Sequence, residues 1–525
     1  MKRKNRLWKM VGKTKKLSIA KYLFFGLLLL CLTFVTSLLY FSDSSSPENE
    51  KSDVNYAKIA PPEFSEDMLD FELETCFFTK PSIITNSTLS TFNHRKEIYS
   101  HEEISKSPVI NILLQFAEFS YELDIEPIII EPSLLFCVLS PSLKSLLLKR
   151  KFTIANRSSD HLLTLGILQK DVAILEKEDV QSRLEKIGFQ IEIVESPILS
   201  WMKPEKFLNS SMFTGHVFLQ KDKWILHLVV FHQRENFMWH AALLSKADSR
   251  TPSIESLFFV DADAAFENFT AVSLGIKAQS LKSLSIPTNP ASFLYQIETS
   301  RFLECNETIV NSFRNHHVSN LSTVHDYSSL SQQEFNQRLL ITIEEMKQKL
   351  DPMLIRFWVW SGTLLGLHRQ CDVIPYTSDA DFATWAMDDE DAREIIKYFK
   401  KNEHLHLNEK LGLVEEAMEL KFRCHGLSVD LFFIYEQENG TWYAGHSPYY
   451  GYYFKYHHPA FSLCSAELLG QKVNTPCEPE DVISAEYGSS WMKPVTSWSY
   501  KYSVYNRGPN IYWKKSLLKK AYPKT

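Results

Sequence analysis

The sequence predicts an α/β (α+β) protein with one N-terminal transmembrane helix followed by two globular domains. Three observations predict this class. The 525 residues are 44% hydrophobic and 13% aromatic, which is enough apolar material for more than one core. Residues 22–41 form one uncharged apolar run, and the chain beyond it alternates between strand-like and helix-like patterns. The net charge of −6 argues against a nucleic-acid partner, because such binding needs a basic surface.

The N-terminus has the pattern of a membrane anchor. Residues 1–21 contain nine Lys and Arg residues and no acidic residue, which predicts a cytosolic basic tail. Residues 22–41 are long enough to cross a hydrocarbon layer of ~30 Å at ~1.5 Å per residue. A cleaved signal peptide is the alternative, but its apolar core usually has only ~7–15 residues. We therefore expect a single-pass type II protein with everything after the anchor in the lumen.

Glycosylation triplets and cysteines agree with a lumenal location. All seven Asn-x-Ser/Thr triplets follow the anchor, at Asn86, Asn156, Asn209, Asn268, Asn306, Asn320 and Asn439. Seven cysteines also follow it: Cys76, Cys137, Cys305, Cys371, Cys424, Cys464 and Cys477. Disulfides form in such a compartment, and an odd number leaves at least one thiol free, metal-bound or intermolecular. The spacing gives no connectivity and does not indicate a zinc site.

Composition divides the remaining chain into four parts. Residues 42–62 are a polar stem linker, 63–290 an N-terminal α/β domain, 291–330 a connector and 331–525 a C-terminal domain. In the N-terminal domain we expect one helix at 177–187 and strands at 133–139, 162–168, 189–194 and 224–231, the last of these in a hairpin.

The C-terminal domain opens with the clearest helix in the chain. Ser331 and Glu334 form a capping box, and Asp351 followed by Pro352 ends the helix. Apolar residues recur on one face, at Phe335, Leu339, Ile343, Met346 and Leu350. A short strand at 357–360 then leads into a turn.

That turn, Ser361-Gly362-Thr363, precedes a predicted helix that includes Leu364 and Arg369. Glycine lets the backbone approach a phosphate, and the hydroxyls and free amides at a helix N-terminus bind anions. Arg369 would add a bidentate phosphate contact. Such a turn is common in structures that bind no phosphate, so the turn alone is weak evidence for a phosphate site. The residues that follow it in the sequence strengthen the interpretation.

The neighbours are carboxylates. Asp379 and Asp381 lie two apart on a predicted strand, so both side chains project from the same face. Paired carboxylates repel unless a cation such as Mg²⁺ or Mn²⁺ lies between them. Asp430 lies within the apolar run 427–435 and is the expected third carboxylate, either a metal ligand or the base that activates a hydroxyl. The alternative for Asp430 is a salt bridge to Lys421 or Arg423.

These motifs resemble the LicD phosphotransferase family, and within it the fukutin-type ribitol-5-phosphate transferases. The resemblance runs through most of 358–513. It includes 362–366 (GTLLG), Arg369, 374–376 (IPY), 379–381 (DAD), 429–433 (VDLFF), 454–456 (FKY), 473–477 (VNTPC), 486–488 (EYG), Trp491, 494–495 (PV) and Trp498. The Thr377-Ser378 pair departs from the more acidic run of bacterial members and leaves the number of metal ions open.

The resemblance implies a polymerase-β-type nucleotidyltransferase fold and a metal-dependent phosphotransferase that uses CDP-ribitol. Ribitol 5-phosphate would pass to an O-mannosyl glycan of a dystroglycan-type glycoprotein, in the Golgi or endoplasmic reticulum, in a complex with other enzymes of that glycan. Carried over by position, Asp379 and Asp381 bind the metal, and Gly362, Thr363 and Arg369 face the donor. The pocket rim would include Lys455, Tyr487, Trp491 and Lys493.

Two rival functions remain open. Asp261-Ala262-Asp263 follows an apolar run, as in nucleotide-sugar glycosyltransferases, so the N-terminal domain is either such an enzyme or a glycosyltransferase-like stem domain. A non-catalytic, glycan-binding scaffold is the second rival. The aromatic run 449–456 either stacks on sugars or is an ordinary strand packed on the core, the interpretation we favour. His457-His458 and Cys424-His425 lack partners at zinc spacing and are interpreted as structural.

Overall fold

The computed structural model describes residues 108–152, 162–202, 211–243, 261–267, 271–273, 284–317, 330–495 and 498–523. The predicted tail, membrane anchor and stem lie outside these residues, as do Cys31, Cys76, Asn86, Asn156, Asn209, Asn268 and Asn320. Within the described ranges, no helix combines the length and apolar character that a membrane crossing requires.

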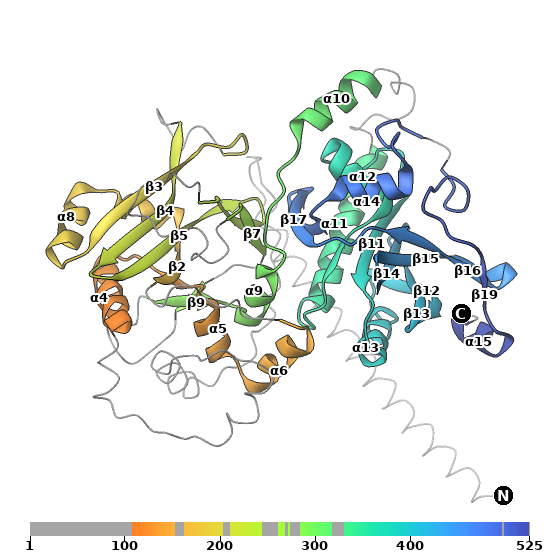
Figure 1. Ribbon diagram of the computed structural model, residues 1–525, viewed down its shortest axis with the longest axis horizontal. Coiled ribbons are helices and arrows are strands. Elements are labelled where there is room, and N and C mark those ends of the chain that lie inside the picture. Colours follow the sequence, from red (N-terminus) through yellow and green to blue (C-terminus); the bar gives the residue numbers. More distant parts are fainter. Residues whose placement is uncertain are drawn as a thin grey trace, which may run out of the picture. The chain divides into compact units, whose positions relative to one another are not determined.

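In the described part of the N-terminal domain, nine strands form one mixed sheet (Figure 1). Its order is β3-β4-β5-β2-β1-β9-β8, with β6 paired to β5 and β7 to β6. The β2–β5 and β1–β9 pairs are parallel. The strands are β1 (Ile128–Ile129), β2 (Leu162–Leu168), β3 (Gln190–Pro197), β4 (Met212–Lys221), β5 (Trp224–Arg234), β6 (Phe237–His240), β7 (Ala264–Glu267), β8 (Ala271–Ser273) and β9 (Ser285–Pro287).

Helices flank this sheet in the sequence: α4 (Pro108–Glu122), α5 (Pro132–Val138), α6 (Pro141–Lys149), α7 (Gln169–Leu175), α8 (Glu178–Lys186) and α9 (Pro290–Ile297). The predicted helix at 177–187 and the strands at 162–168, 189–194 and 224–231 are confirmed, and β4–β5 is the expected hairpin. The predicted strand at 133–139 is wrong, because this segment is helix α5. Pro132 occupies its first turn, where proline favours helix initiation, and a short apolar run has no period that separates strand from helix.

The predicted connector contains helix α9 and helix α10 (Glu307–His317). Phe293 and Leu294 of α9 are buried in the core of the N-terminal domain. Just before α10, Cys305 forms a disulfide with Cys371, the residue that ends helix α12 of the C-terminal domain. This disulfide closes a segment that includes the turn of the candidate site.

The C-terminal domain has a second sheet, of order β10-β11-β14-β15-β16-β19, with β13 paired to β14 and β12 to β13; β17 and β18 form a separate hairpin. Its strands are β10 (Phe357–Val359), β11 (Asp379–Trp385), β12 (Leu405–Leu413), β13 (Glu416–Cys424), β14 (Leu427–Gln437), β15 (Gly440–Ser447), β16 (Tyr452–His458), β17 (Leu463–Leu468), β18 (Gln471–Pro476) and β19 (Ile511–Tyr512). Its helices are α11 (Leu330–Leu350), α12 (Ser361–Gln370), α13 (Asp389–Phe399), α14 (Pro479–Tyr487) and α15 (Lys515–Ala521), with a 3₁₀ turn at Pro448–Tyr450.

Helix α11 has the predicted length and the predicted end before Asp351. Four of the five apolar residues on its predicted inner face are fully buried: Leu339, Ile343, Met346 and Leu350. The Ser331 side chain of the predicted capping box lies outside the described residues.

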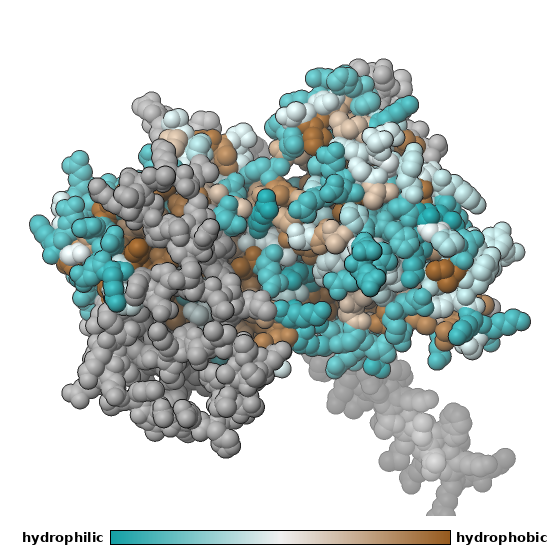
Figure 2. Space-filling model, in the orientation of Figure 1, coloured by the Kyte–Doolittle hydropathy of each residue, from teal (hydrophilic) through white to brown (hydrophobic). Residues whose placement is uncertain are grey.

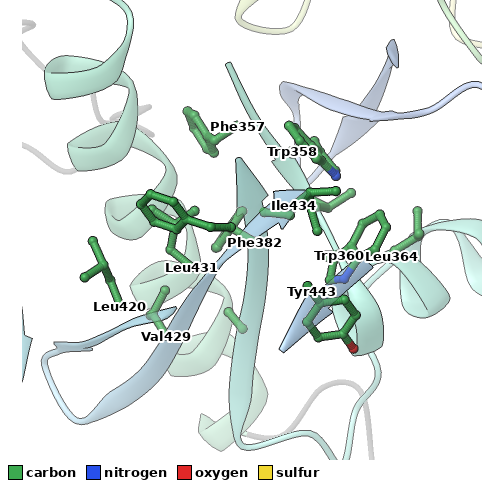
Figure 3. Packing of buried hydrophobic residues seen from close by; sticks show 14 of the residues in the cluster. Phe357, Trp358, Trp360, Leu364, Phe382, Leu420, Val429, Leu431, Ile434 and Tyr443 are labelled. Atoms are coloured by element: carbon green, nitrogen blue, oxygen red, sulfur yellow. The ribbon is translucent and has the colours of Figure 1, made fainter. Parts of the chain in front are cut away.

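The core of the C-terminal domain lies directly behind the candidate site. Figure 3 shows Phe357 and Phe382 close to Leu431, and Trp360 beside Tyr443 and Leu364. The Trp360 and Tyr443 rings meet edge to face, with their centroids 5.8 Å apart. This packing fixes the strand that carries the turn at Ser361. A second disulfide joins Cys464 to Cys477, and the Cys424 thiol is buried and reduced.

The two domains meet at a buried ionic cluster. Glu267 of β7 pairs with Lys347 of α11 at 3.1 Å and with Lys472 of β18 at 3.5 Å. Beside it lies Asp351, whose pKa is raised to about 7 by burial and by the charge of Glu267. A cavity of about 20 Å³ adjoins the cluster and the back of strand β10, large enough for one water molecule.

Two of the four buried histidines of the N-terminal sheet, His216 and His240, make its stability depend on pH. His216, His227, His232 and His240 are at most 2% exposed, and His216 Nδ1 lies 3.1 Å from His227 Nε2. Burial lowers the pKa of His216 to about 3 and that of His240 to about 4. In the unfolded chain a histidine has a pKa of about 6.5, so the folded state binds fewer protons below that pH. Their contribution is therefore fully present above about pH 6.5 and is lost as the pH falls.

We predict that His216→Gln reduces the dependence of the free energy of unfolding on pH. Each neutral buried histidine contributes about 1.4 kcal/mol per pH unit below its unfolded pKa. Urea unfolding between about pH 4.5 and 6 should therefore give a shallower slope for the variant by roughly that amount. The matched control is His406→Gln at an exposed position of β12, which should keep the wild-type slope. Equal slopes for His216→Gln and the wild type would contradict this account.

Candidate active site

Two parallel strands bring three predicted carboxylates together. In the β11–β14 register Asp381 lies beside Asp430, and Asp379 lies two residues before Asp381 on the same face. Asp379 is exposed and accepts a hydrogen bond from Thr377 Oγ1 at 2.9 Å. The register therefore places Asp379, Asp381 and Asp430 on one face of the sheet, and their convergence on a shared cation stays a prediction.

Asp381 binds the turn that was expected to bind a phosphate. The Gly362 amide donates to Asp381 Oδ2 at 3.1 Å, and the Asp381 amide donates to Thr363 Oγ1 at 2.9 Å. A Cβ atom at position 362 would lie 3.3 Å from Asp381 Oδ2 and would crowd it. Glycine thus admits the protein's own carboxylate to the N-terminus of α12, where the free amide and the helix dipole favour negative charge.

Ser361 adopts a strained backbone conformation at the start of this helix. Its φ is +43°, in the left-handed region that costs a non-glycine residue about 1–2 kcal/mol. Ser361 Oγ donates to Glu486 Oε1 at 2.6 Å and lies 3.1 Å from Tyr487 Oη. Strain of this kind persists where the surroundings fix it, and it often marks a functional site.

Glu486 of helix α14 is a fourth carboxylate of the cluster. It is 3% exposed and accepts a second hydrogen bond from Tyr443 Oη at 3.2 Å. Burial raises the pKa of Glu486 to about 6, although the bonds from Ser361 and Tyr443 oppose the shift. Sequence patterns do not single out Glu486, because a glutamate near the end of an ordinary helix has no distinctive spacing. Its place in the EYG segment of the family resemblance is the signal that could have identified it.

The four carboxylates act on one another electrostatically. Burial raises the pKa of Asp381 well above its ordinary value, and the charges of the other three carboxylates raise it further. The Gly362 amide opposes this shift. Such a donor set has the oxygen chemistry that Mg²⁺ and Mn²⁺ prefer, and a cation there would offset the repulsion.

Within the described residues, no group of three or more His, Cys, Asp or Glu side chains is arranged so that it could hold a metal ion. The exposed Asp379 and the half-buried Asp381 are the two carboxylates that fit a cation here, since no lysine or arginine pairs with either of them among the described residues.

The structure corrects the expectation that Asp430 is an unpaired charge within its strand. Asp430 is paired, because Lys421 Nζ lies 2.8 Å from Asp430 Oδ2 and 2.6 Å from Glu419 Oε1. The salt bridge to Lys421, which was the alternative, is therefore present. Burial and the charge of Glu419 still raise the pKa of Asp430 to about 6, against the effect of Lys421. The role of Asp430 as a metal ligand stays a prediction.

Two predicted donor contacts lie away from the cluster. Arg369 is 1% exposed, with its guanidinium 4.5 Å from the Phe313 ring and Nη1 bonded to the Trp491 carbonyl, so it links α10 and α12 instead of facing a phosphate. Lys455 lies on the opposite face of the β15–β16 ladder from Tyr443, because Lys455 pairs with Ala444. Its ammonium group lies 3.6 Å from the Trp442 ring centroid.

Of the predicted rim residues, only Tyr487 is shown in contact with the cluster. Trp491 packs on His368, with the ring centroids 5.4 Å apart, and Lys493 is exposed. In the run 449–456, Tyr453, Phe454 and Tyr456 are buried on the core, as favoured, while Tyr449 and Tyr450 are exposed.

The second acidic pair has a structural use in the N-terminal domain. Asp263 Oδ1 accepts a hydrogen bond from the Ala242 amide at 2.7 Å, and its carbonyl accepts one from the Phe302 amide. Asp261 is exposed. Asp263 thus ties two loops together, and the role of this pair in a glycosyltransferase site stays a prediction.

Comparison with known proteins gives two family matches. Residues 354–478 match the family described as LicD/FKTN/FKRP, nucleotidyltransferase domain, and residues 143–327 match the family described as fukutin N-terminal. The first match contains the turn at Ser361 and the three predicted carboxylates, and it ends before Glu486.

Several relatives align with a large part of the chain. The Homo sapiens and Mus musculus proteins named ribitol-5-phosphate transferase FKTN are each 31% identical to this chain over 335 residues, 63% of this chain and 69% of each relative. An uncharacterised Caenorhabditis elegans protein is 29% identical over 273 residues, 49% of this chain and 65% of that protein.

We predict that Asp381→Asn abolishes stabilisation by a divalent cation. A cation that binds only the folded chain raises the melting temperature, and removing a central carboxylate removes that binding. The melting temperature of the wild type should rise on addition of Mn²⁺, and that of Asp381→Asn should not. Without metal, the variant should be at least as stable as the wild type, because a repelled buried carboxyl is gone.

The matched control is Asp222→Asn in the exposed β4–β5 turn, where φ is +55° and asparagine is well tolerated. This control should respond to Mn²⁺ as the wild type does. A melting temperature that rises equally in Asp381→Asn would show that the cation binds elsewhere.

Proposed function

The chain belongs to the fukutin family, and from this premise we propose that it transfers ribitol 5-phosphate from CDP-ribitol to a hydroxyl of a glycoprotein glycan and releases CMP. The observation that carries the proposal is the carboxylate cluster at the N-terminus of α12. Its three aspartates lie within the segment that matches the nucleotidyltransferase family. The named relatives are ribitol-5-phosphate transferases, and this chain spans 69% of the length of each.

Asp379 and Asp381 would hold a Mg²⁺ or Mn²⁺ ion, which supplies positive charge for the donor pyrophosphate. The chain's own residues fix the positions of these two carboxylates. Thr377 orients Asp379, and the Gly362 amide orients Asp381. Positioning and charge compensation are the main contributions that proteins make to phosphoryl transfer.

Asp430 is the group we propose as the proton acceptor. Lys421 binds its Oδ2 atom, which orients the carboxyl group and keeps Oδ1 available for an acceptor hydroxyl. The hydroxyl oxygen forms a bond to the phosphorus that bears ribitol, its proton passes to Asp430, and the bond from that phosphorus to the CMP oxygen breaks. A carboxyl with a pKa of about 6 accepts a proton more readily than one of ordinary pKa.

Glu486 is better placed to hold the turn than to move a proton. Both of its oxygens already accept hydrogen bonds, from Ser361 and from Tyr443. It therefore acts as a positioning residue for Ser361 and, through the adjacent Gly362, for Asp381.

The experiment that tests this function offers CDP-ribitol, CDP-glycerol and CDP-choline to the full-length chain with a phosphorylated O-mannosyl glycopeptide. We expect CMP release and transfer with CDP-ribitol. Asp430→Asn should lower kcat by about 10²–10⁴-fold, because a general base contributes that much, and should leave the affinity for CDP-ribitol nearly unchanged. Asp222→Asn is again the matched control. Full activity of Asp430→Asn would remove Asp430 from the mechanism.

We also propose that the described domains lie in the lumen of the Golgi or endoplasmic reticulum, behind a single anchor at residues 22–41. The support is the charge asymmetry around that run and the triplet at Asn439, which is exposed in the β14–β15 turn. Expressed in animal cells, the chain should carry N-glycans that peptide N-glycosidase removes. Asn439→Gln should abolish one of them on a gel, and Asn402→Gln, which alters no triplet, should abolish none. A chain without any N-glycan would contradict the topology.

A further inference from the structure

The end of the chain has an unusual composition. Residues 487–525 contain eight Lys and Arg residues and no Asp or Glu, although the whole chain has a net charge of −6. The same 39 residues contain nine Tyr and Trp residues. Cations and planar rings are therefore concentrated in one segment that directly follows Glu486 of the candidate site.

Five of these rings are exposed. Four of them lie close together in the sequence, within residues 498–505, and are here called the aromatic platform: Trp498, Tyr500, Tyr502 and Tyr505. Their exposed fractions are 39%, 51%, 87% and 72%. Exposed large rings gathered in one short segment are characteristic of binding surfaces.

Hydrogen bonds hold the platform against the sheet. Tyr456 Oη donates to the Tyr500 carbonyl, and Tyr500 Oη donates to the His446 carbonyl at 3.4 Å. The Tyr505 amide donates to the Glu486 carbonyl at 3.1 Å. The backbone beneath the rings is thus fixed, which reduces the entropy that a ligand must remove on binding.

The platform is continuous with the carboxylate cluster. The Trp498 ring packs on Tyr487 with the centroids 4.6 Å apart, and Tyr487 Oη lies 3.1 Å from Ser361 Oγ. Ser361 is adjacent to Gly362, whose amide binds Asp381. A ligand that contacts Trp498 therefore lies near the carboxylate cluster.

Two lysines give this surface positive charge. Lys501 Nζ lies 5.3 Å from the Tyr500 ring centroid and 3.2 Å from Ser447 Oγ, and Lys493 is exposed at the start of the segment. Neither lysine pairs with a carboxylate in the part of the chain that the structure describes. Both charges are free to meet an anionic ligand.

We propose that the aromatic platform, with Lys493 and Lys501, binds the sugar rings of an acidic acceptor glycan. The proposal rests on the function above, because a transferase of this kind needs an acceptor beside its carboxylates. Tyrosine suits a sugar, since the ring packs on C–H groups while its hydroxyl stays solvated. Several rings spread over eight residues suit several sugar units, whereas a donor nucleotide offers one base.

A membrane surface fits these observations less well. Membrane-binding surfaces expose Leu, Phe and Trp, whereas three of the four platform rings are tyrosines. On the face drawn in Figure 2, hydrophobic residues of the C-terminal domain form small separate areas among hydrophilic ones.

The test measures binding directly, with no donor present, by titrating the full-length chain with one oligosaccharide in neutral, phosphorylated and sulfated forms. We expect the two acidic forms to bind at least about tenfold more tightly, as charge-assisted contacts do. Tyr502→Ala should weaken binding of all forms about five- to tenfold, the effect of one lost ring contact, and Tyr502→Phe should restore it. Lys501→Gln should weaken only the acidic forms.

The matched controls lie in the N-terminal domain. Tyr121→Ala removes a ring that is 58% exposed, and Lys223→Gln removes a cation 5.2 Å from the Trp224 ring centroid, much as Lys501 lies over Tyr500. Both should bind as the wild type does. The affinity for CDP-ribitol should be the same in Tyr502→Ala and in the wild type.

Three results would overturn the proposal: unchanged oligosaccharide binding in Tyr502→Ala and Lys501→Gln, an equal loss of CDP-ribitol affinity in Tyr502→Ala, or variant-sensitive binding of phosphatidylserine vesicles without oligosaccharide binding. Platform-dependent binding of acidic oligosaccharides by a chain that transfers no ribitol phosphate would support the platform and refute the proposed function, so the two failures are distinguishable.

Discussion

Repulsion among four carboxylates on one face of the C-terminal sheet is the constraint around which this domain is built. Asp379, Asp381, Asp430 and Glu486 are brought together by the parallel β11–β14 pair and by helix α14. Each is held by a specific group: Asp379 by Thr377, Asp381 by the Gly362 amide, Asp430 by Lys421, and Glu486 by Ser361 and Tyr443. The strained φ of Ser361 makes two of these contacts possible at once, because it turns the hydroxyl and the next amide toward different carboxylates.

Strand periodicity was enough to predict that the aspartates of β11 and β14 are the central residues of the site. Two aspartates two residues apart must share a face, and a charged residue within an apolar strand must have a partner. The length and inner face of α11 followed from helical spacing in the same way. The partner of Asp430 is harder to predict from the sequence, because a metal ion and Lys421 would both compensate its negative charge. Only the β13–β14 register decides which side chain lies opposite Asp430.

Other features depended on packing between distant segments. Arg369 has the chemistry of a phosphate ligand, but Phe313 of α10 and the Trp491 carbonyl enclose it. Glu486 joins the site because helix α14, more than one hundred residues after the turn, packs on α12. A strand is the wrong prediction for helix α5 because a run of only seven residues, most of them apolar, has no decisive period. Sequence periodicity predicts elements well, and it does not predict which elements meet.

The ionic cluster at Glu267 has a consequence for how the two halves of the chain depend on each other. Lys472 is almost fully buried, and its charge is compensated by a glutamate that belongs to the other domain. If the N-terminal domain were deleted, Lys347 and Lys472 would lose their ion-pair partner, and Asp351 would be the acidic neighbour that remains beside them. A buried lysine whose charge is less well compensated lowers the stability of a domain, so the second half of the chain should tolerate the loss of the first half poorly. The two halves are thus coupled through folding, independently of any shared role in chemistry.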